Sequence, residues 1–137
     1  MDNRNNRYTS TAEALNYSGA EAKGDYTMFA HQDMWLDLDL WLEDNEGILR
    51  LIPDLGVAGV AGMSEESRNW AERVRFSIDV FDDKISEEML PVEAPVGVQT
   101  LDECLLIVPR PVFVGLQFDN EVFDGWDCYG ADYCLSV

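Results

Sequence analysis

Histidine and cysteine are scarce in this chain of 137 residues, and each shortage excludes a class of site. His31 is the only histidine, so a zinc centre built from histidine and cysteine ligands is not expected. The three cysteines cannot all pair within one chain, and Cys128 and Cys134 do not have a recognised zinc-binding spacing. We therefore expect reduced thiols, which are typical of a cytoplasmic protein.

Long apolar runs are also missing. No stretch of the sequence approaches the roughly 18 consecutive apolar residues that a membrane-spanning helix requires. The first seven residues, MDNRNNR, contain no apolar segment of the kind that a secretory signal carries. The sequence thus predicts neither a transmembrane segment nor a secretory leader.

Positive charge is the third shortage, because 9 lysines and arginines face 27 acidic residues and give a formal charge of −18. Such an excess of negative charge repels phosphate backbones, so nucleic acid is not an expected partner. Only Lys23 and Lys84 are lysines. This composition suits either a halophilic protein, whose charges are screened in concentrated salt, or an ordinary acidic protein of the cytoplasm.

The rest of the composition is that of a folded protein, with 47% hydrophobic and 11% aromatic residues. We find no internal repeat and no linker, so residues 1–137 are expected to form a single domain. The capping-box pattern Ser10-Thr11-Ala12-Glu13 predicts a helix as far as Ala22, and the apolar segment Tyr26–Ala30 predicts a buried strand. Helical spacing of apolar residues predicts a second helix over Leu38–Leu51.

The second half of the chain is richer in predicted strands. Strands are expected at residues 56–62, 73–81, 96–100 and 103–108, followed by a short turn at 112–116, a loop at 118–125 and a helix that begins at Gly130. This order predicts an α/β domain with a mixed sheet and flanking helices. The chain opens with a helix where a βαβ unit would open with a strand, and it ends within a helix, so we expect it to be cut at both ends.

Asp33 is the first residue with a predicted chemical role. It follows the Tyr26–Ala30 strand directly, and α/β sheets bind ligands at the carboxyl ends of their strands. One carboxylate with open coordination positions suits Mg²⁺ or Mn²⁺ that is held largely by a diphosphate. The alternative is that Asp33 is an ordinary turn or helix-capping residue before Trp35.

A second candidate site lies in residues 123–132, where three aspartates accompany Trp126 and Tyr129. Aromatic rings can stack on the apolar faces of sugars, and a carboxylate can serve as a general base. Residues 123–132 could therefore form an aromatic-walled platform for a sugar, with a carboxylate as general base. The alternative is a glycine-hinged loop whose tryptophan fills the core and whose aspartates face water.

Several segments, in the same order and spacing, resemble the glycosyltransferase family 2-like proteins. They are residues 10–16 (STAEALN), 22–33 (AKGDYTMFAHQD), Trp41-Leu42 and 53–62 (PDLGVAGVAG), followed by three pieces of a later motif, Phe118-Asp119, 123–126 (FDGW) and 129–135 (YGADYCL). The most similar branch carries His-Gln-Asp where most relatives carry Asp-x-Asp. The likeness spans nearly the whole chain.

The resemblance implies a GT-A fold that transfers a sugar from a nucleotide-diphosphate donor to a glycan or lipid-linked acceptor, with inversion and with Mn²⁺ or Mg²⁺. It implies that Asp33 binds the metal and the donor diphosphate, and it places His31 where the first aspartate of Asp-x-Asp usually lies. It also implies donor contacts for Asp2, Asn3 and Asn16, and a position beside the acceptor for Asp102.

The chain departs from this branch in two ways. Where the branch usually has Gly-Trp-His-x-Tyr-Asp-x-Asp, residues 125–132 have Asp127 in place of the histidine and Gly130 in place of an aspartate that is often the base. For a transferase of this family we therefore expect Asp127 to act as the base, with Asp132 as the second choice, and Trp126 to stack on the acceptor sugar. The first βαβ unit of the family is also absent, which predicts an exposed sheet edge with unpaired N–H and C=O groups. The alternative function is therefore an inactive relative or binding module that pairs through this edge with a second copy or a partner chain.

Overall fold

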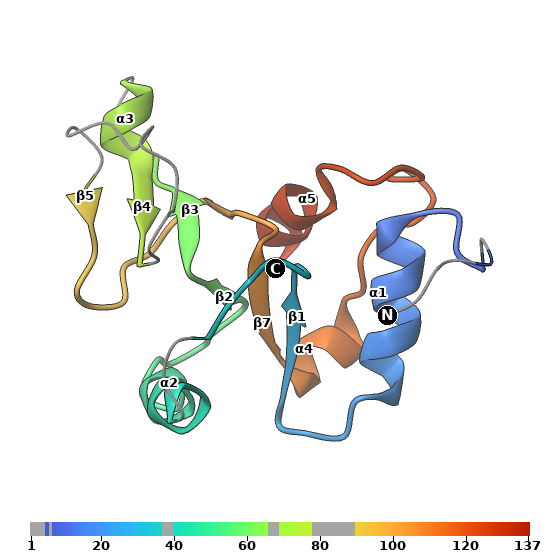
Figure 1. Cartoon of the computed structure of the whole chain (residues 1–137), viewed down its shortest axis with the longest axis horizontal. Coiled ribbons are helices and arrows are strands. Elements are labelled where there is room, and N and C mark those ends of the chain that lie inside the picture. Colours follow the sequence, from blue (N-terminus) through green and yellow to red (C-terminus); the bar gives the residue numbers. More distant parts are fainter. Residues whose placement is uncertain (1–4, 6, 37–39, 66–68, 78–89) are drawn as a thin grey trace.

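The structure, a computed structural model, describes residues 5, 7–36, 40–65, 69–77 and 90–137. The chain forms two small β-sheets, and helices cover both faces of the first sheet (Figure 1). Within these described ranges, no helix has the length and apolar character that crossing a bilayer requires. The longest described helix, α1 (Thr11–Glu21), has 11 residues.

The first sheet is antiparallel and has the order β1-β7-β2. Its strands are β1 (Tyr26–Ala30), β7 (Leu105–Pro109) and β2 (Ala58–Gly59). The central strand β7 is buried from Leu105 to Val108, as expected for an apolar run that has a packed layer on each face. Met28 of β1 lies opposite Ile107 of β7, which fixes the register of the pair.

The core divides into two clusters, one on each face of the first sheet. Leu106 and Val108 point toward α1, α4 (Arg110–Gly115) and α5 (Tyr129–Ser136), where the buried residues of the cluster are Ala12, Phe29, Leu106, Val108, Phe113, Phe118, Tyr129 and Tyr133. Leu105 and Ile107 point the other way and pack with Leu49 of α2 (Trp41–Leu49). Successive side chains of β7 point to opposite faces of the sheet, so this one strand packs against the helices on both faces.

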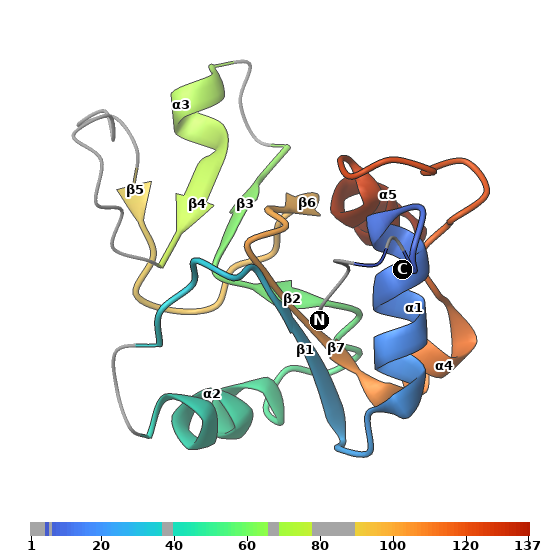
Figure 2. The same cartoon turned by 45° about the vertical axis from the view of Figure 1, so that its right-hand side comes forward.

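The second sheet has the order β5-β4-β3-β6. It consists of β5 (Leu90–Pro91), β4 (Val74–Phe76), β3 (Ala61–Met63) and β6 (Thr100–Leu101), and the short helix α3 (Trp70–Arg73) precedes β4. β4 and β5 are parallel, and the other pairs are antiparallel. β6 leads into β7 and also packs against α5, so it links the two sheets (Figure 2).

The strand predicted for Tyr26–Ala30 and the helix start at Ser10 are confirmed. The Ser10 hydroxyl accepts a hydrogen bond from the Glu13 N–H at 3.1 Å, and the Glu13 carboxylate accepts from the Thr9 N–H at 2.7 Å. The hydrogen bond from the Thr9 backbone N–H is the main cause of a lowered pKa of Glu13, and a second bond from the Thr9 hydroxyl adds to it. The helix predicted for residues 38–51 is observed as α2, with residues 37–39 outside the described ranges.

Four predicted elements differ from the structure. The segment expected as a strand at 96–100 belongs to a strand only at Thr100, the first residue of β6. Of the strand expected at 73–81, β4 covers 74–76, Arg73 ends α3, and 78–81 lie outside the described residues.

The single strand expected at residues 56–62 is two strands, β2 and β3, which belong to different sheets. Residues 112–115 of the turn expected at 112–116 belong to α4, because Pro111 lies in the first turn of the helix, where proline is tolerated. The α/β content is confirmed, but the described strands form two small, mainly antiparallel sheets where one mixed sheet was expected. The GT-A arrangement and the absence of a first βαβ unit stay predictions.

Candidate functional site

Two turns meet at the end of the first sheet where β1 finishes and β7 begins. The His31 N–H donates a hydrogen bond to the Cys104 carbonyl at 2.8 Å, so the residues after β1 lie beside those that precede β7. The turn after β1 is closed by a bond from the Met34 N–H to the His31 carbonyl at 3.1 Å. This contact places the turn that carries Asp33 beside the turn that carries Asp102 and Glu103.

Asp33 and His31 form an exposed pair. His31 Nδ1 lies 2.5 Å from Asp33 Oδ1, and their side chains are 57% and 76% exposed. The hydrogen bond with His31 lowers the pKa of Asp33, so its carboxylate stays ionised to a lower pH than usual. One carboxylate oxygen is occupied by the imidazole, and the side chain is otherwise open to solvent.

Asp102 organises the turn before β7. Its Oδ1 accepts a hydrogen bond from the Cys104 N–H at 2.9 Å, in the manner of an Asx turn. Burial, with the hydrogen bond to Asp102 as a second cause, raises the pKa of the Cys104 thiol to about 12. Cys104 is therefore a protonated thiol at neutral pH and not a nucleophile.

Glu103 reaches from the same turn to the start of α5. Its Oε1 accepts a hydrogen bond from the Gly130 N–H at 2.8 Å, at a helix end where the N-cap residue Cys128 makes no side-chain bond. A Cβ at position 130 would lie 2.6 Å from Glu103 Cγ, so only glycine leaves room for this carboxylate. Glu103 thus satisfies one of the free N–H groups at the N-terminus of α5.

The pKa of Glu103 is raised mainly because the side chain is partly buried. The Gly130 N–H opposes this shift, whereas the charges of Asp102 and Asp127 add to it. Burial raises the pKa of Tyr129 to about 12, and the same three carboxylates contribute. The charges of Asp102 and Asp127 therefore act on Glu103, and we call these three residues the acidic cluster.

The loop before α5 carries the predicted aromatic residue. Trp126 is 56% exposed, so it does not fill the core. The Gly125 carbonyl accepts a hydrogen bond from the Thr11 N–H at 3.1 Å, which fixes this loop to the start of α1. Asp132 is half-buried in the first turn of α5, one turn beyond the loop.

Asn16, on α1, holds the backbone of Phe118. Its Nδ2 donates to the Phe118 carbonyl at 2.8 Å, and its Oδ1 accepts from the Phe118 N–H at 2.9 Å. This pair of bonds joins α1 to the loop after α4, and donor binding by Asn16 stays a prediction. Asp2 and Asn3 lie outside the described residues.

The predicted metal site remains a prediction as well. In the part of the chain that the structure describes, no group of three or more His, Cys, Asp and Glu side chains is arranged to hold an ion. The donor chemistry of Asp33 still suits Mg²⁺ or Mn²⁺, because such ions are commonly held by one or two carboxylates and a substrate phosphate. Asp33 offers one ionised, exposed carboxylate of this kind.

Glu103 is the residue that sequence reasoning missed. Nothing in the local pattern of residues 100–108 separates it from a solvated acid. The available signal was Gly130, because a glycine near the start of a predicted helix indicates that another group approaches closely. The partner of that glycine could not be identified from the sequence.

Comparison with known protein families matches residues 4–137 to a family described as "Glycosyltransferase like family". No curated protein matches the chain significantly. The match covers the two turns, α5 and the Trp126 loop, so the candidate site lies wholly within it.

Proposed function

The chain belongs to the Glycosyltransferase like family, and from this membership we propose that it transfers a sugar from a nucleotide-diphosphate donor to a hydroxyl group of an acceptor. The reaction would take place at the end of the first sheet, between the Asp33 turn and the acidic cluster. The observation that supports this location is the hydrogen bond from the His31 N–H to the Cys104 carbonyl, which holds the two turns side by side.

A transfer with inversion requires a base within hydrogen-bond reach of the acceptor hydroxyl. We propose Glu103 for this role, because its raised pKa brings it nearer to neutral pH and its bond to Gly130 fixes its position. Asp127, the base predicted from the sequence, is exposed beside it and is the alternative. Asp102 and Trp126 would line the acceptor side.

The proposed step is a single displacement. The acceptor hydroxyl gives its proton to the base while its oxygen forms a bond to the anomeric carbon. The bond from that carbon to the diphosphate breaks, and the nucleoside diphosphate leaves with the bonding electrons. Asp33 would hold Mn²⁺ or Mg²⁺ together with the donor diphosphate, and the ion would neutralise the charge of the leaving group.

The test is a turnover assay with a panel of nucleotide sugars and simple glycoside acceptors in the presence of Mn²⁺. We expect release of nucleoside diphosphate and a glycosylated product for at least one pair. Glu103→Gln should lower kcat and remove the acidic limb of the pH–rate profile, whereas Asp127→Asn should keep that limb. If Asp127→Asn removes the acidic limb and Glu103→Gln keeps it, the base is Asp127. No turnover with any pair would reject the proposed activity for this chain.

A free strand edge supports a second candidate function. The Asp25 carbonyl accepts a hydrogen bond from the Arg110 N–H at 2.8 Å, and the His31 N–H donates to the Cys104 carbonyl. The backbone N–H and C=O groups of the odd-numbered residues from 25 to 31 therefore face β7. In an antiparallel ladder the backbone groups of Tyr26, Met28 and Ala30 then face away from β7. Among the described strands, only β7 pairs with β1.

An inactive relative could use this edge to bind a second copy or a partner chain by strand addition. Native mass spectrometry tests this function directly. Paired chains are expected for the unsubstituted protein, and Met28→Pro should separate them, because it removes an N–H from the free side and none from the β7 ladder. A chain that remains monomeric at all concentrations would reject edge pairing.

A further inference from the structure

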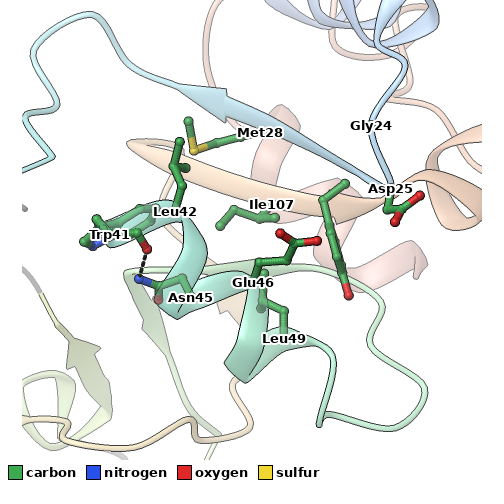
Figure 3. A pocket seen from close by; sticks show the side chains of 10 residues that line it. Gly24, Asp25, Met28, Trp41, Leu42, Asn45, Glu46, Leu49 and Ile107 are labelled. Atoms are coloured by element: carbon green, nitrogen blue, oxygen red, sulfur yellow. Dashed lines mark hydrogen bonds between the residues drawn. The ribbon is translucent and has the colours of Figure 1, made fainter. Parts of the chain in front are cut away.

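A separate cavity lies between α2 and the face of β1 and β7 that is turned away from α1. Its volume is about 240 Å³. Figure 3 shows Trp41 at one end and Asp25 at the other, with Met28, Leu42 and Ile107 between them. Apolar side chains form most of the wall, and Tyr26 adds a second aromatic ring. The cavity therefore offers an apolar slot with aromatic residues.

Its polar side chains are those of Asp25, Asn45 and Glu46, together with the Tyr26 hydroxyl. The Arg50 guanidinium, at the end of α2, lies 2.6 Å from Glu46 Oε1 and 3.4 Å from Asp25 Oδ2, so it compensates both carboxylates. Asn45 Nδ2 donates to the Trp41 carbonyl at 2.8 Å (Figure 3). The oxygen of the Asn45 amide and the second oxygen of each carboxylate make no hydrogen bond with other described residues.

The free oxygens of Asp25, Asn45 and Glu46 are thus hydrogen-bond acceptors, while the Tyr26 hydroxyl and the second Nδ2 hydrogen of Asn45 can donate. None of its lining residues is positively charged, so the cavity does not suit a phosphate or a carboxylate. A ligand that fits must donate several hydrogen bonds and also present an apolar surface to the aromatic rings. Sugars have both features, because their hydroxyl groups donate and their C–H faces are apolar.

Size limits the ligand further. Pockets for drug-sized ligands usually hold about 300–1,000 Å³, so a cavity slightly below this range suits one ring and no longer chain. We propose that the cavity between α2 and the β1–β7 face is a binding site for one neutral monosaccharide unit. Hydroxyl groups would donate to Asp25, Asn45 and Glu46, and a C–H face would lie against Trp41.

This site is distinct from the proposed catalytic site. The cavity includes Gly24 and Asp25, which precede β1, whereas the Asp33 turn follows the other end of the strand. Monosaccharide binding here does not depend on the proposed transfer reaction. A chain without transferase activity is still expected to bind a sugar at this place, so the two proposals can fail separately.

Nuclear magnetic resonance of the full chain tests the proposal, with the methyl glycosides of glucose, galactose, mannose and N-acetylglucosamine as probes. We expect at least one glycoside to give saturable shifts of the Trp41 indole N–H and of the Asn45 side-chain amide. Asn45→Leu should weaken the affinity about tenfold, since it removes an acceptor. Asp44→Asn, on the exposed side of the same helix, is the matched control and should leave the affinity unchanged.

Three results would overturn the proposal. The first is the absence of saturable shifts with every glycoside, and the second is a set of shifts confined to the Trp126 indole and the loop around it. The third is saturation of the Trp41 and Asn45 signals by tetramethylammonium while all the glycosides fail, because that would identify a cation site. The mapping on the unsubstituted protein gives a decisive answer even if Asn45→Leu does not fold.

Discussion

The Glu103 carboxylate accepts a hydrogen bond from the Gly130 N–H at 2.8 Å across a separation of 27 residues. This contact joins the turn before β7 to the start of α5, and the carboxylate occupies the space that a side chain at position 130 would need. It also places a partly buried acid with a raised pKa beside Asp127. The base of the proposed reaction depends on this relationship.

Gly130→Ala should therefore displace Glu103. The added Cβ would lie 2.6 Å from Glu103 Cγ, so either the carboxylate or α5 must move. We expect the free energy of unfolding to fall by about 1–3 kcal/mol, the usual cost of overpacking, as measured by urea denaturation. Gly97→Ala is the control, because a Cβ at position 97 would meet nothing within 4 Å. Equal stability of the two variants would contradict the close contact.

Glu103→Gln should change how stability depends on pH. The folded-state pKa of Glu103 is raised above its usual value of 4.5, so its stabilising effect is present below that value and is lost as the pH rises through the folded pKa. A neutral glutamine does not lose this contribution. The variant should therefore gain stability relative to the unsubstituted protein as the pH rises above 4.5. Glu43→Gln, an exposed acid of α2, should show no such gain.

Asn16 should matter for stability whether or not it contacts a donor. Its amide makes two hydrogen bonds to the Phe118 backbone, at 2.8 and 2.9 Å. Asn16→Leu leaves both backbone groups without this partner and should lower the free energy of unfolding by about 1–3 kcal/mol. Asn16→Asp keeps the acceptor and loses the donor, so an intermediate loss is expected. A neutral effect of Asn16→Leu in chemical denaturation would contradict the observed clamp.

The net charge of −18 predicts a strong effect of salt. Potassium chloride screens the repulsion among like charges, so the melting temperature should rise with its concentration. Circular dichroism measures this rise, with sorbitol of equal osmolality as the control for general solvent effects. Unfolding at low salt would favour halophilic adaptation, and a melting temperature independent of salt would contradict a significant role of self-repulsion.

The sequence predicted those helices and strands whose boundaries are set by neighbouring residues. The apolar residues Tyr26–Ala30 are bounded by Gly24 and by His31-Gln32-Asp33, and the Ser10 hydroxyl caps its own helix, so β1 and the start of α1 could be placed from the sequence. The division of residues 56–62 between two sheets could not, because an apolar glycine-rich run has the same composition in either arrangement.

The candidate site shows the same limit. Asp33 and Asp127 could be proposed as site residues from the sequence because each follows or lies within a recognisable segment. The contact of Glu103 with Gly130 depends on how β7 and α5 pack, and no pattern within 27 residues encodes that packing. The proximity of the Asp33 turn to the acidic cluster likewise arises from the antiparallel pairing of β1 with β7.

Isothermal titration calorimetry with UDP and with GDP, each with and without Mn²⁺, tests the central claim most directly. We expect binding of at least one nucleotide that depends on Mn²⁺ and that Asp33→Ala weakens about tenfold or more, whereas Asp44→Ala on α2 leaves it unchanged. Absence of binding by both nucleotides, or equal binding by the Asp33→Ala variant, would contradict a donor site at the end of β1.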